Sequence, residues 1–171
     1  MYFQHPIISQ TLVDGVLSDR PERGSGIHGQ GHWLRVERNG LFLAEKEGAD
    51  PIIVSLFALF HDSRRINDAT DPEHGKRGAQ LALALFADDL LPVSQDQLEV
   101  LVFACEGHTD TLYSGDITVG SCWDADRLDL TRIGLSPDSR YLNTATAKRL
   151  ADAGNSDREL DGYLFSVSPN C

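Results

Sequence analysis

Apolar residues recur along much of the chain at intervals of three and four positions, the spacing that gathers them on one face of a helix. The pattern predicts helices over residues 7–17 and from 28 to about 47. A third helix is predicted from the Asp50-Pro51 pair through Phe60, because aspartate is a favoured cap and proline a favoured first residue. This third helix is apolar on almost every side, which places it at the centre of the core.

The same pattern continues beyond residue 70, with helix start signals at Asp71-Pro72-Glu73 and at Ser136-Pro137. Ser94 and Gln97 have the spacing of a capping box. The remaining expected elements, in chain order, are a helix over 78–90, a helix from 94 to about 106, a loop over 107–120 with a short extended piece around Ile117, a helix over 121–133, and helical stretches over 143–153 and 157–165.

Strand signals are scarce, and we find no internal repeat, low-complexity segment or linker. The sequence therefore predicts an all-α fold, in one compact domain over residues 1–171 whose C-terminal helices lie within 136–165. A chain of 171 residues suits one domain and can bury a core large enough to keep water out of a site.

The charge balance narrows the classes of partner. Fifteen Lys and Arg stand against 26 Asp and Glu, for a formal net charge of −11. An acidic surface argues against binding a nucleic-acid polymer or an anionic membrane, which both need basic surface. A small phosphorylated substrate stays compatible, because a bound metal and local arginines can outweigh a negative surface nearby. The oligomeric state is open, a homo-oligomer included.

The three cysteines, Cys105, Cys122 and Cys171, are odd in number and have no CxxC spacing. They suggest neither a disulfide framework nor a zinc ribbon, and they fit a reduced, cytoplasmic compartment. The first two lie in apolar surroundings and are expected in the core, whereas the last is expected to be exposed. The N-terminal residues lack the basic and apolar regions of a secretory signal, and the longest apolar stretch, 52–60, is too short to cross a bilayer.

A histidine and an aspartate, His61 and Asp62, directly follow the most apolar predicted helix. Leaving a carboxylate unpaired in a dry environment costs several kcal/mol, so it should be paired, hydrogen-bonded or bound to a metal. Imidazole and carboxylate together are natural ligands for a divalent transition metal. Taken alone, the pair is better explained as a solvated helix end, because the dipeptide is common by chance.

Further histidines and aspartates lie beside the predicted helices, and the order along the chain is His, His-Asp, His, His, Asp. The pieces are His32-Trp33-Leu34-Arg35-Val36, Phe60-His61-Asp62, His74-Gly75-Lys76-Arg77-Gly78-Ala79, His108-Thr109 and Ala125-Asp126-Arg127-Leu128-Asp129. Each piece is a weak motif, but the ordered set resembles the HD superfamily of metal-dependent phosphohydrolases over a core motif region of about 28–133. The resemblance implies a helical HD-type domain that hydrolyses a phosphoester with metal-activated water.

The resemblance also implies a ligand set. One metal would be held by His32, His61, Asp62 and Asp126. His74 and His108 match the extra pair of members with two metals, in which the carboxylate of the His-Asp pair bridges the ions; cyclic-dinucleotide phosphodiesterases and diadenosine-tetraphosphate hydrolases are such members. Histidines with carboxylates suit Fe, Mn, Ni, Co or Zn better than Ca, so we expect one or two divalent transition-metal ions.

Asp124 competes with Asp126 for the last ligand position. Two residues apart on a helix, their side chains point about 200° apart, so one of them is expected to be a ligand. The family's Ala-Asp-x-Leu form selects Asp126, and Asp124 is then a candidate to hydrogen-bond a ligand histidine.

Several charged residues near these motifs are candidates for substrate contacts. Arg64 and Arg65 directly follow the His-Asp pair and suit a phosphate group, although a solvated helix end or an ion pair with Asp68 or Asp71 explains them equally well. Lys76 and Arg77 have the same candidate role with less support.

The other candidates flank the ligand histidines. His28 lies four residues before His32, as a further ligand, a cap or a hydrogen-bond donor behind a ligand. Glu106 and Asp110 flank His108, where a general acid or base could act, although solvated loop residues are the preferred interpretation. Asp62 itself is a candidate base if the metal does not engage it fully.

The expected function is hydrolysis of a nucleotide or another small phosphorylated metabolite. Two alternatives remain at this point. Some HD-type proteins are di-iron oxygenases with the same ligand set, and a third possibility is a non-catalytic nucleotide-binding sensor that keeps the metal site. The sequence offers no discriminator between hydrolase and oxygenase, whereas the full ligand set favours an enzyme over a sensor.

Overall fold

The computed structural model of the protein describes residues 2–18 and 26–154. The described part is helical and contains no strand. In chain order its elements are α1 (Gln10–Leu17), α2 (Gln30–Glu47), α3 (Pro51–Phe60), α4 (His74–Ala87), α5 (Gln95–Gly107), α6 (Ile117–Leu128), the 3-10 helices η1 (Asp129–Ile133) and η2 (Ser139–Tyr141), and α7 (Ala145–Ala153). The predicted all-α fold is confirmed.

Local chemistry explains most of the helix ends. The Asp50 side chain accepts a hydrogen bond from the backbone N–H of Ile52, which caps α3 as predicted. Ser94 and Gln97 form the predicted capping box at the start of α5. Gly48 ends α2 with a φ of 78°, a left-handed conformation that glycine adopts without strain.

Three boundaries differ from the sequence prediction. The loop over 107–120 is shorter than expected, because the Asp116 side chain accepts hydrogen bonds from two backbone N–H groups and starts α6 at Ile117. Ile117 is therefore helical and not extended. α4 begins at His74, directly after the start signal at 71–73 but four residues before the helix predicted over 78–90, and α1 begins at Gln10 with Ser9 as its cap. The helical stretch predicted over 157–165 and the exposure predicted for Cys171 lie outside the described residues.

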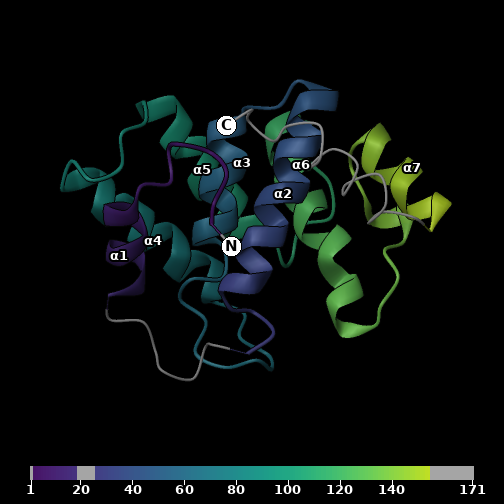
Figure 1. Ribbon diagram of the computed structural model, residues 1–171, viewed down its shortest axis with the longest axis horizontal. Coiled ribbons are helices and arrows are strands. Elements are labelled where there is room, and N and C mark those ends of the chain that lie inside the picture. The colour runs from purple at the N-terminus through teal and green to yellow at the C-terminus, as the bar shows by residue number, and fades with distance from the viewer. Residues whose placement is uncertain (1, 19–25, 155–171) are drawn as a thin grey trace.

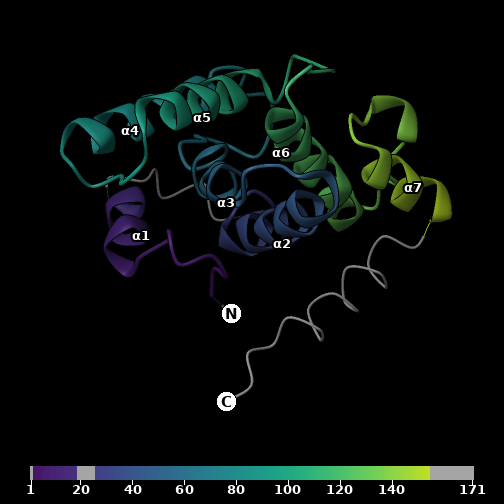
Figure 2. The same ribbon diagram turned by 90° about the horizontal axis from the view of Figure 1, so that it is seen from above.

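The helices pack in layers around α3 (Figures 1 and 2). α4 and α5 pack against each other on one side of α3, and α2 with α6 covers the other side. α7 lies at the outer edge, against α2 and α6. The buried apolar side chains of all these layers form a single cluster, which includes the predicted core residues Cys105 and Cys122. No helix in the described ranges has the length and apolar character needed to cross a membrane.

Two glycines let α4 approach its neighbours closely. A Cβ atom at Gly78 would lie 2.3 Å from the carbonyl oxygen of Phe60, at the end of α3. A Cβ atom at Gly75 would lie 2.2 Å from the carbonyl oxygen of Cys105 on α5. Both distances are too short for any side chain, so these positions explain the glycines in the motif that follows His74. The close approach places the start of α4 beside the ends of α3 and α5.

Candidate metal centre

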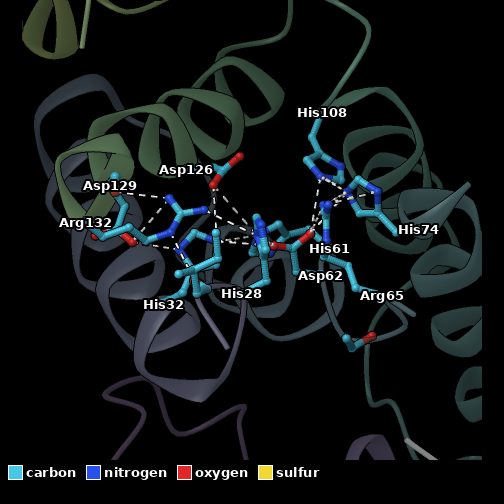
Figure 3. A network of polar contacts seen from close by, with 12 residues as sticks. His28, His32, His61, Asp62, Arg65, His74, His108, Asp126, Asp129 and Arg132 are labelled. Carbon is cyan, nitrogen blue, oxygen red and sulfur yellow. Dashed lines mark hydrogen bonds and ion pairs between the residues drawn. The ribbon is translucent and has the colours of Figure 1, made fainter. Parts of the chain in front are cut away.

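The structure brings the six predicted ligands together at one place, from five helices (Figure 3). His32 is on the first turn of α2, His61 and Asp62 follow the last turn of α3, His74 starts α4, His108 follows α5, and Asp126 lies on the last turn of α6. Five of the six side chains are buried, and Asp126 is 22% exposed. Residues far apart in sequence thus converge because the ends of the packed helices meet here.

One group of ligand atoms lies between α2, α3 and α6, and we call it the α2–α6 half. It consists of the Nε2 atoms of His32 and His61, Oδ1 of Asp126 and Oδ2 of Asp62. His32 Nε2 lies 3.0 Å from His61 Nε2, 3.3 Å from Asp126 Oδ1 and 3.5 Å from Asp62 Oδ2. His61 Nε2 lies 3.6 Å from the Asp62 oxygen and 3.9 Å from the Asp126 oxygen.

The second group, which we call the α4–α5 half, lies on the other side of Asp62. His74 Nε2 is 2.8 Å from His108 Nε2 and 3.1 Å from Asp62 Oδ1, and His108 Nε2 is 3.9 Å from the same oxygen. Asp62 therefore turns one carboxylate oxygen toward each half. A cation held in either half would therefore contact a different oxygen of this carboxylate.

The donor set fits a divalent transition metal. Metal–nitrogen bonds of about 2.0–2.1 Å place two ligand atoms of one tetrahedral or octahedral ion about 3.0–3.4 Å apart. The Nδ1 atoms of His61, His74 and His108 all face backbone carbonyl oxygens, of Phe57, Asp71 and Cys105 respectively. Because a carbonyl only accepts, each Nδ1 carries the hydrogen, and in the neutral ring the Nε2 lone pair points into the centre. Such converging lone pairs are favourable around a cation.

The protonation states of the centre are shaped by burial and by close opposite charges. Burial opposes protonation of His32, but its contacts with three carboxylates prevail and raise its pKa to about 10. Burial lowers the pKa of His61 to about 3. Burial opposes ionisation of Asp62 as well, yet the surrounding histidines hold its pKa well below the ordinary value. The centre therefore keeps its carboxylates ionised and attracts positive charge.

His28 joins the centre more closely than a capping role requires. Its Nδ1 lies 2.8 Å from Oδ2 of Asp62, and together with His32 and Asp62 it forms a third group of potential ligand atoms within 4.8 Å of one another.

Arg65 is also at the centre. Its guanidinium lies 3.4 Å from Oδ1 of Asp62 and 3.1 Å from Nε2 of His74, and it donates to the carbonyl oxygen of Ala69.

Other predicted contacts lie away from the centre. Arg64 donates to the carbonyl oxygens of Val16 and Ser18 at the end of α1. Arg77 pairs with Asp71, so Asp71 is not the ion-pair partner of Arg64 or Arg65 as one alternative held. Lys76 is exposed and pairs with Glu73. Glu106 is exposed and Asp110 lies at the cavity described below; neither has a contact that assigns it an acid or base role.

Asp124 points away from the histidines. It is buried and accepts hydrogen bonds from the backbone N–H groups of Asn143 and Thr144, which join α6 to the start of α7. The expectation that it hydrogen-bonds a ligand histidine is wrong for this reason. Asp126, on the opposite side of α6, is the aspartate that faces the centre, as the family pattern selects.

Two residues at the centre were given no role in the site from the sequence. Asp129 accepts a hydrogen bond from Nδ1 of His32 at 2.7 Å and also pairs with Arg35. Arg132 lies 3.4 Å from Nδ1 of His28. The signals for Asp129 were its place in the motif over 125–129 and its position three residues after Asp126, which places both on one face of a helix. Arg132 follows three residues later again.

A cavity of about 500 Å³ opens onto the centre. Its wall includes Asp62, His74, His108 and Asp126, so both halves face it. Four polar or charged residues complete much of the remaining wall: Arg65, Thr109, Arg127 and Arg132. The arrangement presents the carboxylates of Asp62 and Asp126 and the imidazoles of the α4–α5 half to a molecule that enters the cavity, with three guanidinium groups nearby.

The fold has a solved counterpart. It is similar to the crystal structure of a predicted HD superfamily hydrolase from an uncultured Thermotogales bacterium, with a TM-score of 0.63 over 91% of this chain and 89% of that chain. The sequence identity is 23%. The chain thus shares its fold with a predicted member of the superfamily that its ordered motifs resemble. No profile of a known protein family and no curated protein matches the sequence.

Proposed function

We propose that this protein is a metal-dependent hydrolase of a small phosphoester, holding one or two divalent transition-metal ions (Fe, Mn, Ni, Co or Zn). The observation that carries the proposal is the Asp62 carboxylate, whose two oxygens face different pairs of histidines. Ions bound there would supply Lewis acidity that activates water and offsets phosphate charge. The fold shared with a predicted hydrolase supports the same class of activity.

The surrounding residues suit a phosphate group. Arg65, Arg127 and Arg132 line the cavity at the centre. One guanidinium group can donate two parallel hydrogen bonds to the oxygens of a phosphate group. In this protein of net charge −11, they provide the local positive charge that an anionic substrate needs. Their role in the reaction would be to bind and orient the phosphate group against the two halves of the centre.

A neighbouring apolar cavity supports an organic substrate over inorganic phosphate. It measures about 360 Å³ and shares Arg127 and Leu130 with the cavity at the centre. Leu112, Leu135 and Tyr141 line it and are each about half exposed. Such a wall suits a planar or apolar group, and a nucleobase is the example we favour. The proposed substrate is therefore a nucleotide or a comparable phosphorylated metabolite.

The test is a set of phosphomonoesters and phosphodiesters, nucleotides included, incubated with protein loaded with each candidate metal. We expect metal-dependent release of phosphate or of a nucleotide, and loss of that activity in Asp62→Ala. Asp14→Asn is the matched control, because Asp14 is exposed on α1, where it accepts a hydrogen bond from Gln10, and it lines neither cavity. Absence of hydrolysis with every metal would reject the proposal. Nucleotide binding without turnover would then indicate a sensor, and substrate-dependent oxygen uptake an oxygenase.

A further inference from the structure

The apolar cavity beside the metal centre has walls from two segments that are far apart in the chain. Leu112 comes from the loop between α5 and α6, whereas Tyr141 belongs to η2, which precedes α7. Both side chains are about half exposed, so their burial does little to fix the positions of the two segments. Polar contacts join the two walls instead.

Arg127, on the last turn of α6, contacts both walls. Its guanidinium donates to the carbonyl oxygens of Thr111 at 2.6 Å and Leu112 at 2.7 Å in one segment, and to that of Tyr141 at 2.9 Å in the other. The guanidinium carbon also lies 5.8 Å from the centre of the buried Trp123 ring. Because a guanidinium presents its N–H groups in a rigid planar fork, this one side chain fixes the distance between the two segments.

A second polar residue joins the same segments and depends on the same face of α6. The Asn143 side chain accepts a hydrogen bond from the backbone N–H of Ser114 and donates to the carbonyl oxygen of Leu112. Asp124 accepts hydrogen bonds from both the backbone and the side chain of Asn143. Asp124 and Arg127 are three residues apart and share one face of the helix. That face of α6 therefore organises both walls of the apolar cavity.

The same turn of α6 also serves the metal centre. Asp126, which faces the ligand histidines, directly precedes Arg127, and consecutive side chains on a helix point about 100° apart. Arg127 and Leu130 line both the cavity at the centre and the apolar cavity. A substrate whose phosphate group lies at the centre would therefore have its organic part beside the walls that Arg127 holds.

We propose that Arg127 is a positioning residue that determines selectivity for the organic part of the substrate, because it fixes the two walls that contact this part. The inference rests on the proposed function, which places a nucleobase in the apolar cavity. It is compatible with a contribution of the Arg127 charge to phosphate binding, since three N–H groups contact carbonyls and a guanidinium has five. The two contributions can be separated, because a nucleoside carries the base without the phosphate.

The first arm of the experiment measures binding of adenosine, guanosine, cytidine and uridine to the purified protein by equilibrium dialysis. Arg127→Lys keeps the positive charge but replaces the planar fork with a single ammonium group. We expect the nucleoside that the unaltered protein binds most tightly to lose about tenfold or more in affinity in Arg127→Lys, because carbonyl contacts that hold the walls are lost. This arm requires no turnover, so its result is independent of the proposed hydrolase activity.

Arg64→Lys is the matched control. The Arg64 guanidinium also donates to two backbone carbonyl oxygens, those of Val16 and Ser18, but these lie at the end of α1, and Arg64 lines neither cavity. Nucleoside binding should be unchanged in this variant. Thermal melting checks the folding of each protein. The proposal is overturned if the unaltered protein binds no nucleoside, or if folded Arg127→Lys binds it as tightly as Arg64→Lys does.

Leu112→Ala keeps the proposal falsifiable if Arg127→Lys does not fold. It removes a half-exposed side chain from one wall and leaves the backbone carbonyl that Arg127 contacts. We expect weaker nucleoside binding in this variant as well. Unchanged binding would show that the base does not lie between these walls, and the proposal would be overturned.

The second arm compares metal-loaded proteins acting on the nucleoside monophosphate of the preferred base and on glycerol phosphate, which has no base. Arg127→Lys should raise KM about tenfold for the nucleotide and change it less than about twofold for glycerol phosphate, with kcat and metal content unchanged. A general structural defect would instead alter both substrates and the metal content, and equal changes in both KM values would overturn the proposal. If neither substrate is hydrolysed but Arg127→Lys loses nucleoside binding, the hydrolase proposal fails and the role of Arg127 in selecting the base is supported.

Discussion

The two halves of the candidate metal centre share Asp62 but differ in charge. In the α2–α6 half, Asp126 adds a second carboxylate, and Asp129 accepts a hydrogen bond from the far nitrogen of His32. In the α4–α5 half, the two histidines are oriented by backbone carbonyls, and the Arg65 guanidinium lies within 3.4 Å of both His74 and Asp62. The first half thus has a second carboxylate among its ligand atoms, whereas the second half has one carboxylate and a guanidinium beside its ligand atoms.

The difference predicts an order of binding. A cation gains more Coulomb energy between two carboxylates than beside one carboxylate and one guanidinium. We therefore expect the α2–α6 half to hold the tighter ion and the α4–α5 half to hold a weaker one. The one-ion and two-ion interpretations left open by the sequence become two stages of loading. Five substitutions test this, beginning with the one that should affect both halves.

Asp62→Ala should have the largest effect, because it removes an oxygen from each half. We expect the purified variant to retain no metal in either half and to hydrolyse no substrate. Metal content by mass spectrometry after gel filtration, with folding checked by circular dichroism, measures the result. A folded variant that keeps its full metal content would show that Asp62 bridges nothing.

His74→Ala and His108→Ala should each have half of that effect. Each removes a ligand atom from the α4–α5 half, and the α2–α6 half keeps all of its own. We expect one ion per chain to remain and the weaker ion to be lost. His61→Ala is the opposite control, since it should remove the tighter ion. Unchanged metal content in both α4–α5 variants would leave a single-ion centre as the correct description.

The sequence predicted the elements that local rules determine. The capping residue Asp50 and the capping box of Ser94 act within a few residues, so the starts of α3 and α5 could be predicted. The start of α6 was missed although its cap, Asp116, obeys the same rule. Its surroundings of glycine, serine and threonine are typical of a loop, and the helix forms there because α6 packs on α2 and α3.

The candidate site was partly predictable for a related reason. The ordered histidines and aspartates were visible as motifs, but the direction of a side chain depends on how helices pack. Arg64 and Arg65 are neighbours in sequence, yet Arg64 reaches the end of α1 while Arg65 reaches Asp62. No periodicity distinguishes them at a helix end. Asp129 and Arg132 became part of the site only because η1 lies beside the start of α2.

Asp129→Asn should sharpen the comparison with a smaller effect, confined to one half. The carboxylate orients His32 and makes its ring a better ligand, and loss of such a partner typically weakens metal binding roughly 10–100-fold. We expect a decrease of that size in affinity for the tighter ion and no change for the weaker one, measured by competition with a fluorescent chelator. Asp138→Asn serves as the surface control. An equal decrease for both ions would indicate general destabilisation and not positioning of His32.

Arg65→Gln should have the smallest effect, and its sign is opposite. The Arg65 guanidinium lies 3.1 Å from Nε2 of His74, where it competes with a cation for that lone pair. Glutamine removes the charge, and its amide nitrogen takes the position of Arg65 Nε, which donates to the carbonyl oxygen of Asn67. We expect affinity for the weaker ion to rise severalfold, with the tighter ion unchanged, in the same chelator competition. Arg64→Gln, one residue earlier and directed toward α1, should change neither affinity. A lower affinity for the weaker ion in Arg65→Gln would mean that the guanidinium holds the side chains of His74 and Asp62 in place. The two halves would then differ in how their ligand side chains are positioned and not in charge.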